Sequence, residues 1–163
     1  MVNVKLDSLL KIFWCAAMSV RVRDIMVKDV VTIHSGKTVY DAAKLMSEKM
    51  VGCLIVVENG DKPVGIITER DFVRRVLAKD KDPHKTLVKE AMSTPLISVR
   101  PELSVVVASQ EMAEHKIRRL AVVENGKLVG IVTSFDLTKN FGEVANLFVS
   151  AILRGLKLGS LMG

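Results

Sequence analysis

Aromatic residues and cysteines are scarce in this sequence. Of its 163 residues, five are Phe, one is Trp and one is Tyr, so a hydrophobic core must be built from Val, Ile, Leu, Met and Ala. The two cysteines, Cys15 and Cys53, have neither the spacing of metal ligands nor the number that a disulfide framework needs. We therefore expect reduced, buried thiols in a cytoplasmic protein.

Long apolar runs and clustered charges are also missing. The sequence has no run of about 18 apolar residues, so no transmembrane helix is expected. The net charge is +6, but the lysines are dispersed. This pattern suits an anionic small molecule and makes nucleic acid an unlikely partner.

No catalytic constellation is present. His34, His84 and His115 are scattered, and none neighbours a Ser or Cys nucleophile or a second metal ligand in the sequence. The stretch VENGKLVG is a hairpin pattern and not a phosphate-binding loop. We expect neither an enzyme, nor a catalytic cofactor, nor a metal site.

The two ends of the chain differ from its centre. Residues 9–18 resemble a short signal sequence, but Lys11 within this stretch and Asp7 before it argue against one. Met1 and Met18 are both candidate translation starts. Residues 7–18 and 142–158 predict amphipathic helices, which would cover each other or a partner chain, with a membrane surface as the lesser alternative.

The centre of the chain contains two similar segments. VRDIM at residues 22–26 aligns with VKEAM at residues 88–92, and VVENG occurs in both copies at the same spacing of 66. Asp61 is an extra residue in the first copy, after which the spacing becomes 65. A long period that occurs only twice indicates a tandem pair that folds as one pseudo-symmetric body.

Each copy predicts the order β-α-β-β-α, which is a mixed α/β (α+β) class. Thr38 is placed to cap the first helix, and Asn59-Gly60 is a hairpin signal. The predicted elements of the first copy are a strand at 30–33, a helix at 38–50, strands at 53–57 and 64–68, and a helix at 69–79. Those of the second copy are a strand at 96–99, a helix at 104–116, strands at 120–123 and 128–133, and a helix at 134–141. The domains are then a terminal extension (1–20), two repeats (21–80 and 87–141) and a C-terminal helix and tail (142–163).

Both copies end their last strand on Thr-x-x-Asp. Thr68 and Asp71 in the first copy align with Thr133 and Asp136 in the second. A carboxylate can accept the two vicinal hydroxyls of a ribose, whereas Thr-x-x-Asp at a helix start is also a capping arrangement. The repetition favours two ligand sites, and because duplication copies a cap as faithfully as a site, the capping alternative stays open. Gly65 would permit a close approach by backbone or ligand.

The opening VRDIM, the β-α-β-β-α order and the closing Gly-hydrophobic-hydrophobic-Thr-x-x-Asp together resemble the CBS domain. The pair, over residues 22–141, resembles a Bateman module. The resemblance implies two packed antiparallel three-stranded sheets, with clefts between the copies that hold AMP, ADP, ATP or S-adenosylmethionine. It also implies a disc-like homodimer.

The resemblance also assigns site residues. It implies that Asp71 and Asp136 hold ribose, with Thr68 and Thr133 nearby and Arg70 and Phe135 beside the two acids. The remaining family positions come after the first strand and before the second strand of each copy. They are Thr32, Ile33, His34, Gly52, Cys53 and Leu54 in the first copy, and Ser98, Val99, Arg100, Arg118, Arg119 and Leu120 in the second. For the apolar members, ordinary core packing is an equal alternative.

The copies differ just before their second strands. The first has Gly52 and Cys53 where the second has Arg118 and Arg119. The resemblance predicts that the arginines contact phosphate of the ligand anchored by Asp71, which leaves the Asp136 site weaker or suited to a less charged ligand. Alternatively, the arginines point to opposite faces, one into solvent and the other toward Glu111 or Glu114.

Together these patterns predict a regulatory module that binds an adenine nucleotide. Occupancy would be transmitted to a regulated protein partner or to the second chain of a homodimer. The alternative is a structural or interaction subunit, or a nucleic-acid-binding protein, with unliganded clefts.

Overall fold

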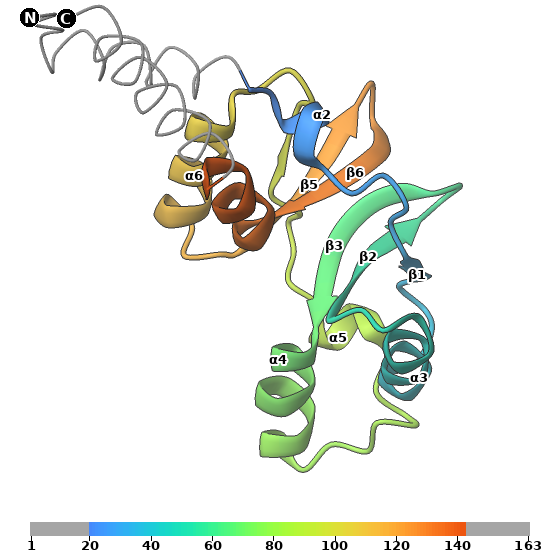
Figure 1. The fold of residues 1–163 in the computed structure, drawn as a ribbon. Coiled ribbons are helices and arrows are strands. Elements are labelled where there is room, and N and C mark those ends of the chain that lie inside the picture. Colours follow the sequence, from blue (N-terminus) through green and yellow to red (C-terminus); the bar gives the residue numbers. More distant parts are fainter. Residues whose placement is uncertain (1–19, 143–163) are drawn as a thin grey trace, which may run out of the picture. The chain divides into compact units, whose positions relative to one another are not determined.

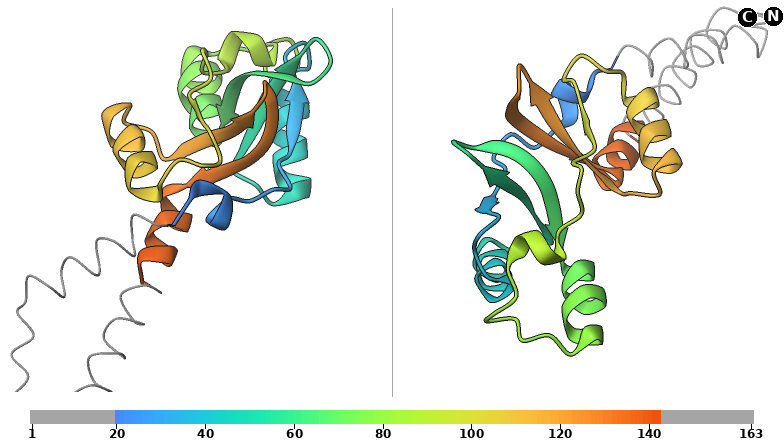
Figure 2. Two further views of the ribbon diagram at one scale, coloured as in Figure 1. Left: turned by 90° about the horizontal axis from the view of Figure 1, so that it is seen from above. Right: turned by 180° about the vertical axis from the view of Figure 1, so that it is seen from behind.

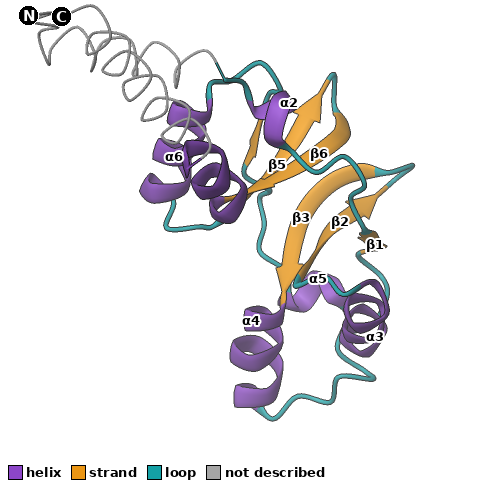
Figure 3. Ribbon diagram, viewed as in Figure 1, coloured by secondary structure: helices purple, strands orange, loops and turns teal. Residues whose placement is uncertain are grey.

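The computed structural model describes residues 20–142. These residues form a mixed α+β fold with two three-stranded sheets, ordered β1-β2-β3 and β4-β5-β6, as Figure 3 shows in orange. None of the helices in this part of the chain has both the length and the apolar character needed to cross a membrane. Cys15 and the predicted terminal helices before residue 20 and after residue 142 lie outside the described residues.

The elements follow the predicted order in both repeats. The first repeat contains α2 (Val22–Ile25), β1 (Thr32–His34), α3 (Val39–Lys49), β2 (Cys53–Glu58), β3 (Lys62–Thr68), α4 (Glu69–Asp71), the π-helix η1 (Phe72–Val76) and the 3₁₀-helix η2 (Leu77–Lys79). The second contains α5 (Val88–Ala91), β4 (Ser98–Val99), α6 (Val105–Glu114), β5 (Arg119–Glu124) and β6 (Lys127–Thr133), followed by a helix at residues 134–142. The β-α-β-β-α prediction is confirmed.

Two details of the prediction are wrong. The sheets are not antiparallel throughout, because β1 pairs with β2 in parallel and β4 pairs with β5 in parallel, whereas β2 and β3 are antiparallel. The reason is that α3 carries the chain back between β1 and β2, so both strands run in the same direction. The helix expected at residues 69–79 is divided into α4, η1 and η2 and is not one regular α-helix.

Local sequence signals explain the helix starts and the hairpin turns. Thr38 caps α3 as predicted, since its Oγ1 accepts a hydrogen bond from the Asp41 N–H at 3.1 Å. The second hairpin turns on Asn125 (φ 51°) and Gly126 (φ 77°), the positive angles that a two-residue turn requires. The first hairpin has the additional Asp61, also at positive φ. The insertion therefore lies within the turn and leaves the ends of β3 and β6 equivalent.

The chain divides into two compact units. One contains residues 27–100 and 121–131, and the other contains residues 20–26, 101–120 and 132–142 of the described chain. In the larger unit, β2 and β3 form a long curved hairpin (Figure 2), and β3 leads directly into α4 (Figure 1).

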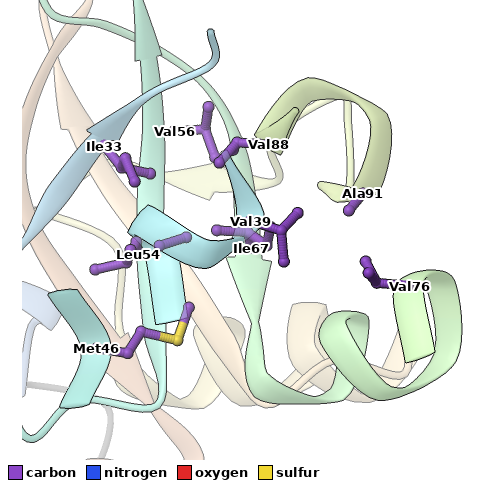
Figure 4. Close-up of a cluster of buried hydrophobic side chains, with 10 residues drawn as sticks. Ile33, Val39, Met46, Leu54, Val56, Ile67, Val76, Val88 and Ala91 are labelled. Atoms are coloured by element: carbon purple, nitrogen blue, oxygen red, sulfur yellow. The ribbon is translucent and has the colours of Figure 1, made fainter. Parts of the chain in front are cut away.

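The core of the larger unit lies between the β1-β2-β3 sheet and its helices. Figure 4 shows Leu54 and Ile67 from the sheet, Val39 and Met46 from α3, and Val76 from η1 in this cluster. Ile55 points to the other face of β2, where it packs with Ala121 and Ile131. Because β2 is covered on both faces, its sequence is a continuous apolar run.

The short helix that opens each repeat packs on the other repeat. In the larger unit the N–H of Val88, in α5, donates to the carbonyl of Lys37 at 2.8 Å. In the smaller unit the N–H of Val22, in α2, donates to the carbonyl of Leu103 at 2.9 Å. The 66-residue repeat aligns the donors of these two bonds with each other, and likewise the acceptors. Both repeats therefore exchange their opening helices in the same way.

Candidate functional site

The first Thr-Asp edge lies where β3 ends. The N–H of Thr68 donates to Oδ2 of Asp71 at 2.9 Å, and the Thr68 hydroxyl donates to the same oxygen at 2.7 Å. Asp71 is only 8% exposed. Because a carboxylate oxygen has two lone pairs, the two donors occupy Oδ2 fully.

The second Thr-Asp edge, where β6 ends, repeats this geometry. The N–H and the hydroxyl of Thr133 donate to Oδ2 of Asp136 at 2.8 and 2.7 Å. The N–H of Asp136 also donates to Oγ1 of Thr133 at 3.3 Å. Asp136 is half-buried. The threonine and aspartate side chains that align in the sequence therefore have equivalent geometry at the two edges.

A third Thr-x-x-Asp, at Thr38 and Asp41, serves as an internal comparison. It forms a capping box at the start of α3, in which Asp41 accepts from the Thr38 N–H at 3.1 Å and is exposed. The hydrogen bonds from the backbone and side chain of Thr38 lower the pKa of Asp41 below its ordinary value of 3.8. At the two edges the acid is more buried, and the Thr hydroxyl donates to its Oδ2 at 2.7 Å. All three motifs cap a helix, and only at the two edges is the threonine the last residue of a strand.

The second carboxylate oxygen distinguishes the two edges. Oδ1 of Asp71 lies 3.4 Å from Nε of Arg75, a residue of η1. Within residues 20–142, Oδ1 of Asp136 has no hydrogen bond or ion pair. Asn140 occupies the position that aligns with Arg75. Sequence reasoning did not identify Arg75, although its i+4 spacing from Asp71 is a signal for an ion pair.

Arg75 also joins the first edge to α5. Its Nη1 donates to the carbonyl of Ala91 at 2.8 Å and to the carbonyl of Met92, and its Nη2 donates to the hydroxyl of Ser93 at 3.1 Å. These carbonyls lie at the C-terminal end of α5, where a guanidinium satisfies groups that have no partner within the helix. One side chain therefore bonds both the acid and the helix end.

The segment after α5 lies directly against β3. A Cβ built on Gly65 would lie 2.8 Å from both Sδ of Met92 and the carbonyl oxygen of Ser93. The N–H of Ser93 donates to the carbonyl of Ile66 at 2.8 Å. The close approach predicted at Gly65 is thus made by backbone from the start of the second repeat.

The predicted residues after the first strand of each copy are partly exposed. Thr32 and His34 are exposed on β1, and the structure places Ile33 in the core. A hollow of about 310 Å³ lies beside them and is lined by Thr32, Ile33, His34, Lys37, Asp41 and Leu45. In the second copy, Ser98 and Arg100 are exposed and Val99 is buried.

The predicted residues before the second strands lie next to the acid of their own copy. The carbonyl of Gly52 accepts from the Glu69 N–H at 3.5 Å, and the carbonyl of Arg118 accepts from the Ser134 N–H at 3.0 Å. Cys53 pairs with Thr68 across the β2–β3 ladder. The predicted assignment of the arginines to the ligand of Asp71 remains a prediction.

Side-chain exposure separates these residues further. Leu54 and Leu120 are fully buried, which agrees with core packing. Arg118 and Arg70 are exposed, Arg119 is half-buried, and Phe135 is 74% exposed. In the described part of the chain neither Arg118 nor Arg119 forms an ion pair with Glu111 or Glu114.

One cluster of possible metal ligands was not predicted. The ligand atoms of Glu111, Glu114 and His115 lie within 4.8 Å of one another at the end of α6. Nδ1 of His115 is also 3.0 Å from the carbonyl oxygen of Glu111. The i, i+3, i+4 spacing on one helix would have revealed the cluster. It lies on the surface, and we assign no ion to it.

The chain is similar to a known protein family and to individual proteins. The family model described as CBS domain matches residues 22–78 and 88–143. The CBS domain-containing protein YhcV of Bacillus subtilis is 44% identical over 119 residues, which are 73% of this chain and 84% of that protein. An uncharacterized protein of Methanopyrus kandleri is 39% identical over 120 residues, which are 73% of this chain but only 61% of that protein.

Solved structures of CBS proteins are also similar to this chain. A hexameric CBS-CP12 protein from bloom-forming cyanobacteria is 38% identical, with a TM-score of 0.68 over 73% of this chain and 69% of that chain. The CBS domain pair of protein MJ0100, in complex with 5′-methylthioadenosine and S-adenosyl-L-methionine, is 31% identical, with a TM-score of 0.69 over 76% of this chain and 97% of that chain.

Proposed function

This chain belongs to the CBS domain family, and from that premise we propose that it binds an adenosine-containing ligand at its Thr-Asp edges. A CBS pair is a regulatory ligand-binding module. The proposed ligands are AMP, ADP, ATP or S-adenosylmethionine. The adenosine compounds bound to the related MJ0100 pair support this class of ligand.

The duplicated carboxylate geometry is the single observation that carries the proposal. At each edge, Oδ2 is occupied by the preceding threonine, which fixes the orientation of the carboxylate. A ribose needs an oriented acceptor for its hydroxyl groups, and an ionised carboxylate is the strongest acceptor among side chains. Asp71 and Asp136 thus take the ribose, and Thr68 and Thr133 hold the acids in position.

We further propose that the module signals and does not catalyse. Its ligand would stabilise one arrangement of the chain through a difference in affinity, and a protein partner or the second chain of a homodimer would detect that arrangement. The related hexameric CBS-CP12 protein shows that chains with this fold assemble. The cytoplasm is the proposed location, since the chain has only two cysteines.

Calorimetric titration with AMP, ADP, ATP and S-adenosylmethionine tests the proposal. We expect the wild-type chain to bind at least one of them with micromolar affinity, and the Asp71→Ala/Asp136→Ala double variant to lose this binding. Asp24→Ala is the matched control, because it removes an exposed acid that accepts from the backbone N–H three residues earlier, at Arg21, and lines neither an edge nor the hollow beside β1. It should bind like the wild type.

Two results would contradict the proposal. One is the absence of binding below millimolar concentration for all four compounds. The other is an equal loss in Asp24→Ala, which would show that loss of a helix-capping acid alone weakens binding. Binding of nucleic acid that weakens steeply with salt and survives the double variant would support the alternative function.

A further inference from the structure

We propose that Arg75 is a latch that keeps the Asp71 edge from accepting ligand until it is released, so that the Asp136 edge fills first. This inference rests on the proposed function and adds a regulatory step to it. It concerns one side chain and its contacts with the acid and with the end of α5.

The two edges differ in what faces the second oxygen of the acid. At both acids the preceding threonine donates twice to Oδ2. Oδ1 of Asp71 forms an ion pair with Arg75, Nε to Oδ1 3.4 Å, whereas Oδ1 of Asp136 has no ion pair within the described residues. A ribose must therefore compete with a cation for Oδ1 at Asp71 but not at Asp136.

Arg75 cannot leave Asp71 without affecting α5. Its guanidinium bonds the carbonyls of Ala91 and Met92 and the hydroxyl of Ser93 as well as the acid. Its side chain is 42% exposed, so it has room to move toward solvent. Ligand that displaces Arg75 would thus loosen the segment that leads from α5 to β4. Occupancy of the Asp71 edge becomes a signal in the second repeat.

The second repeat lacks the parts of this latch. Asn140 stands where the first repeat has Arg75, and residues 134–142 form a regular helix in place of the α4-η1-η2 sequence. Single π-turns such as η1 are frequent at functional sites. The asymmetry therefore comes from the helix that follows Thr-x-x-Asp and not from the motif.

AMP titration of four chains tests the latch: the wild type, Asp136→Ala, Asp136→Ala/Arg75→Gln and Asn140→Arg. Asp136→Ala leaves only the latched edge and should bind AMP weakly. Adding Arg75→Gln should tighten that binding about tenfold, since the ribose no longer competes with a cation for Oδ1 of Asp71. Asn140→Arg places a cation four residues after Asp136 and should weaken the first AMP of the full chain about twofold.

Amide hydrogen exchange separates a latch from a purely structural arginine. AMP added to Asp136→Ala should speed exchange at the amides of Met92 and Ser93, which bond Val88 and Ile66. In Asp136→Ala/Arg75→Gln these amides should already exchange fast and should not respond to AMP. Arg75→Met, which keeps most of the side-chain length but carries no charge, serves if the glutamine variant fails to fold.

The outcomes distinguish the latch from the proposed function. Unchanged or weaker AMP binding on adding Arg75→Gln or Arg75→Met, with the wild type binding normally, overturns the latch alone. Slower exchange at Met92 and Ser93 on addition of AMP to Asp136→Ala does the same. If the wild type binds none of the four adenosine compounds, the proposed function fails and the latch fails with it.

Discussion

The Asp71 and Asp136 edges share a motif but differ in what surrounds it. Their first carboxylate oxygens are bonded alike, because Thr and Asp three residues apart set that geometry locally. Their second oxygens differ, because a residue outside the motif, Arg75, contacts only one of them. A duplicated motif therefore fixes the orientation of an acid, while its availability depends on contacts that the motif does not contain.

Replacing each acid alone should show which edge binds AMP more tightly, and this experiment should give the largest effect. Asp136→Ala should weaken the tightest AMP binding about 100-fold, because about 1–3 kcal/mol is lost for each hydrogen bond to a charged group. Asp71→Ala should change it by less than about threefold. Equilibrium dialysis with labelled AMP measures both. The reverse ranking would support the assignment of Arg118 and Arg119 to the Asp71 ligand.

Gly65→Ala should test the close packing of β3 against the segment after α5, and its effect on stability should be smaller. A Cβ at this position would meet the Ser93 carbonyl at 2.8 Å, so β3 and Ser93 must separate. We expect a loss of about 2 kcal/mol in the free energy of unfolding, measured by urea denaturation. Gly142→Ala is the control, because nothing in the described part of the chain lies within 4 Å of a Cβ there. A Gly65→Ala chain as stable as the control would show that this contact is not tight.

The pH dependence of the Asp41 cap should give the smallest effect. Its folded pKa is lowered by hydrogen bonds from Thr38, so its contribution to stability is present above the ordinary value of 3.8 and is lost as the pH falls through the lower folded pKa. NMR titration of the Asp41 carboxyl carbon should give a midpoint below 3.8 in the wild type. In Thr38→Ala the midpoint should rise. An unchanged midpoint would show that the Thr38 hydroxyl does not stabilise the charge, since the backbone N–H remains in this variant.

Most of the fold could be predicted from the sequence because its signals are local. Thr38, the Asn-Gly turns and the apolar run of β2 each act within a few residues, and the structure has the elements that they indicate. The repeat predicted the elements of the second copy, since these follow from aligning it with the first copy. The exchange of α2 and α5 between the repeats was not predicted, because no local pattern records which copy a short helix will cover.

The candidate site could be predicted only in part. The sequence indicated both acids and both threonines, and it also contained the same four-residue pattern at Thr38, which is a cap. Arg75 was missed because its significance depends on the carbonyls of Ala91 and Met92, which are more than fifteen residues away. Ile33, Leu54 and Leu120 match the family positions but lie in the core, where apolar burial dominates.

The exchanged opening helices have a consequence for how the chain can be divided. A fragment that stops after residue 80 would keep β1, β2 and β3 but lose Val88 and Ala91, which cover their core. The complementary fragment would lose Val22, which is fully buried. Each half thus contains the short helix that covers the core of the other half. After gene duplication, this exchange of helices means that neither copy can be separated without exposing its core.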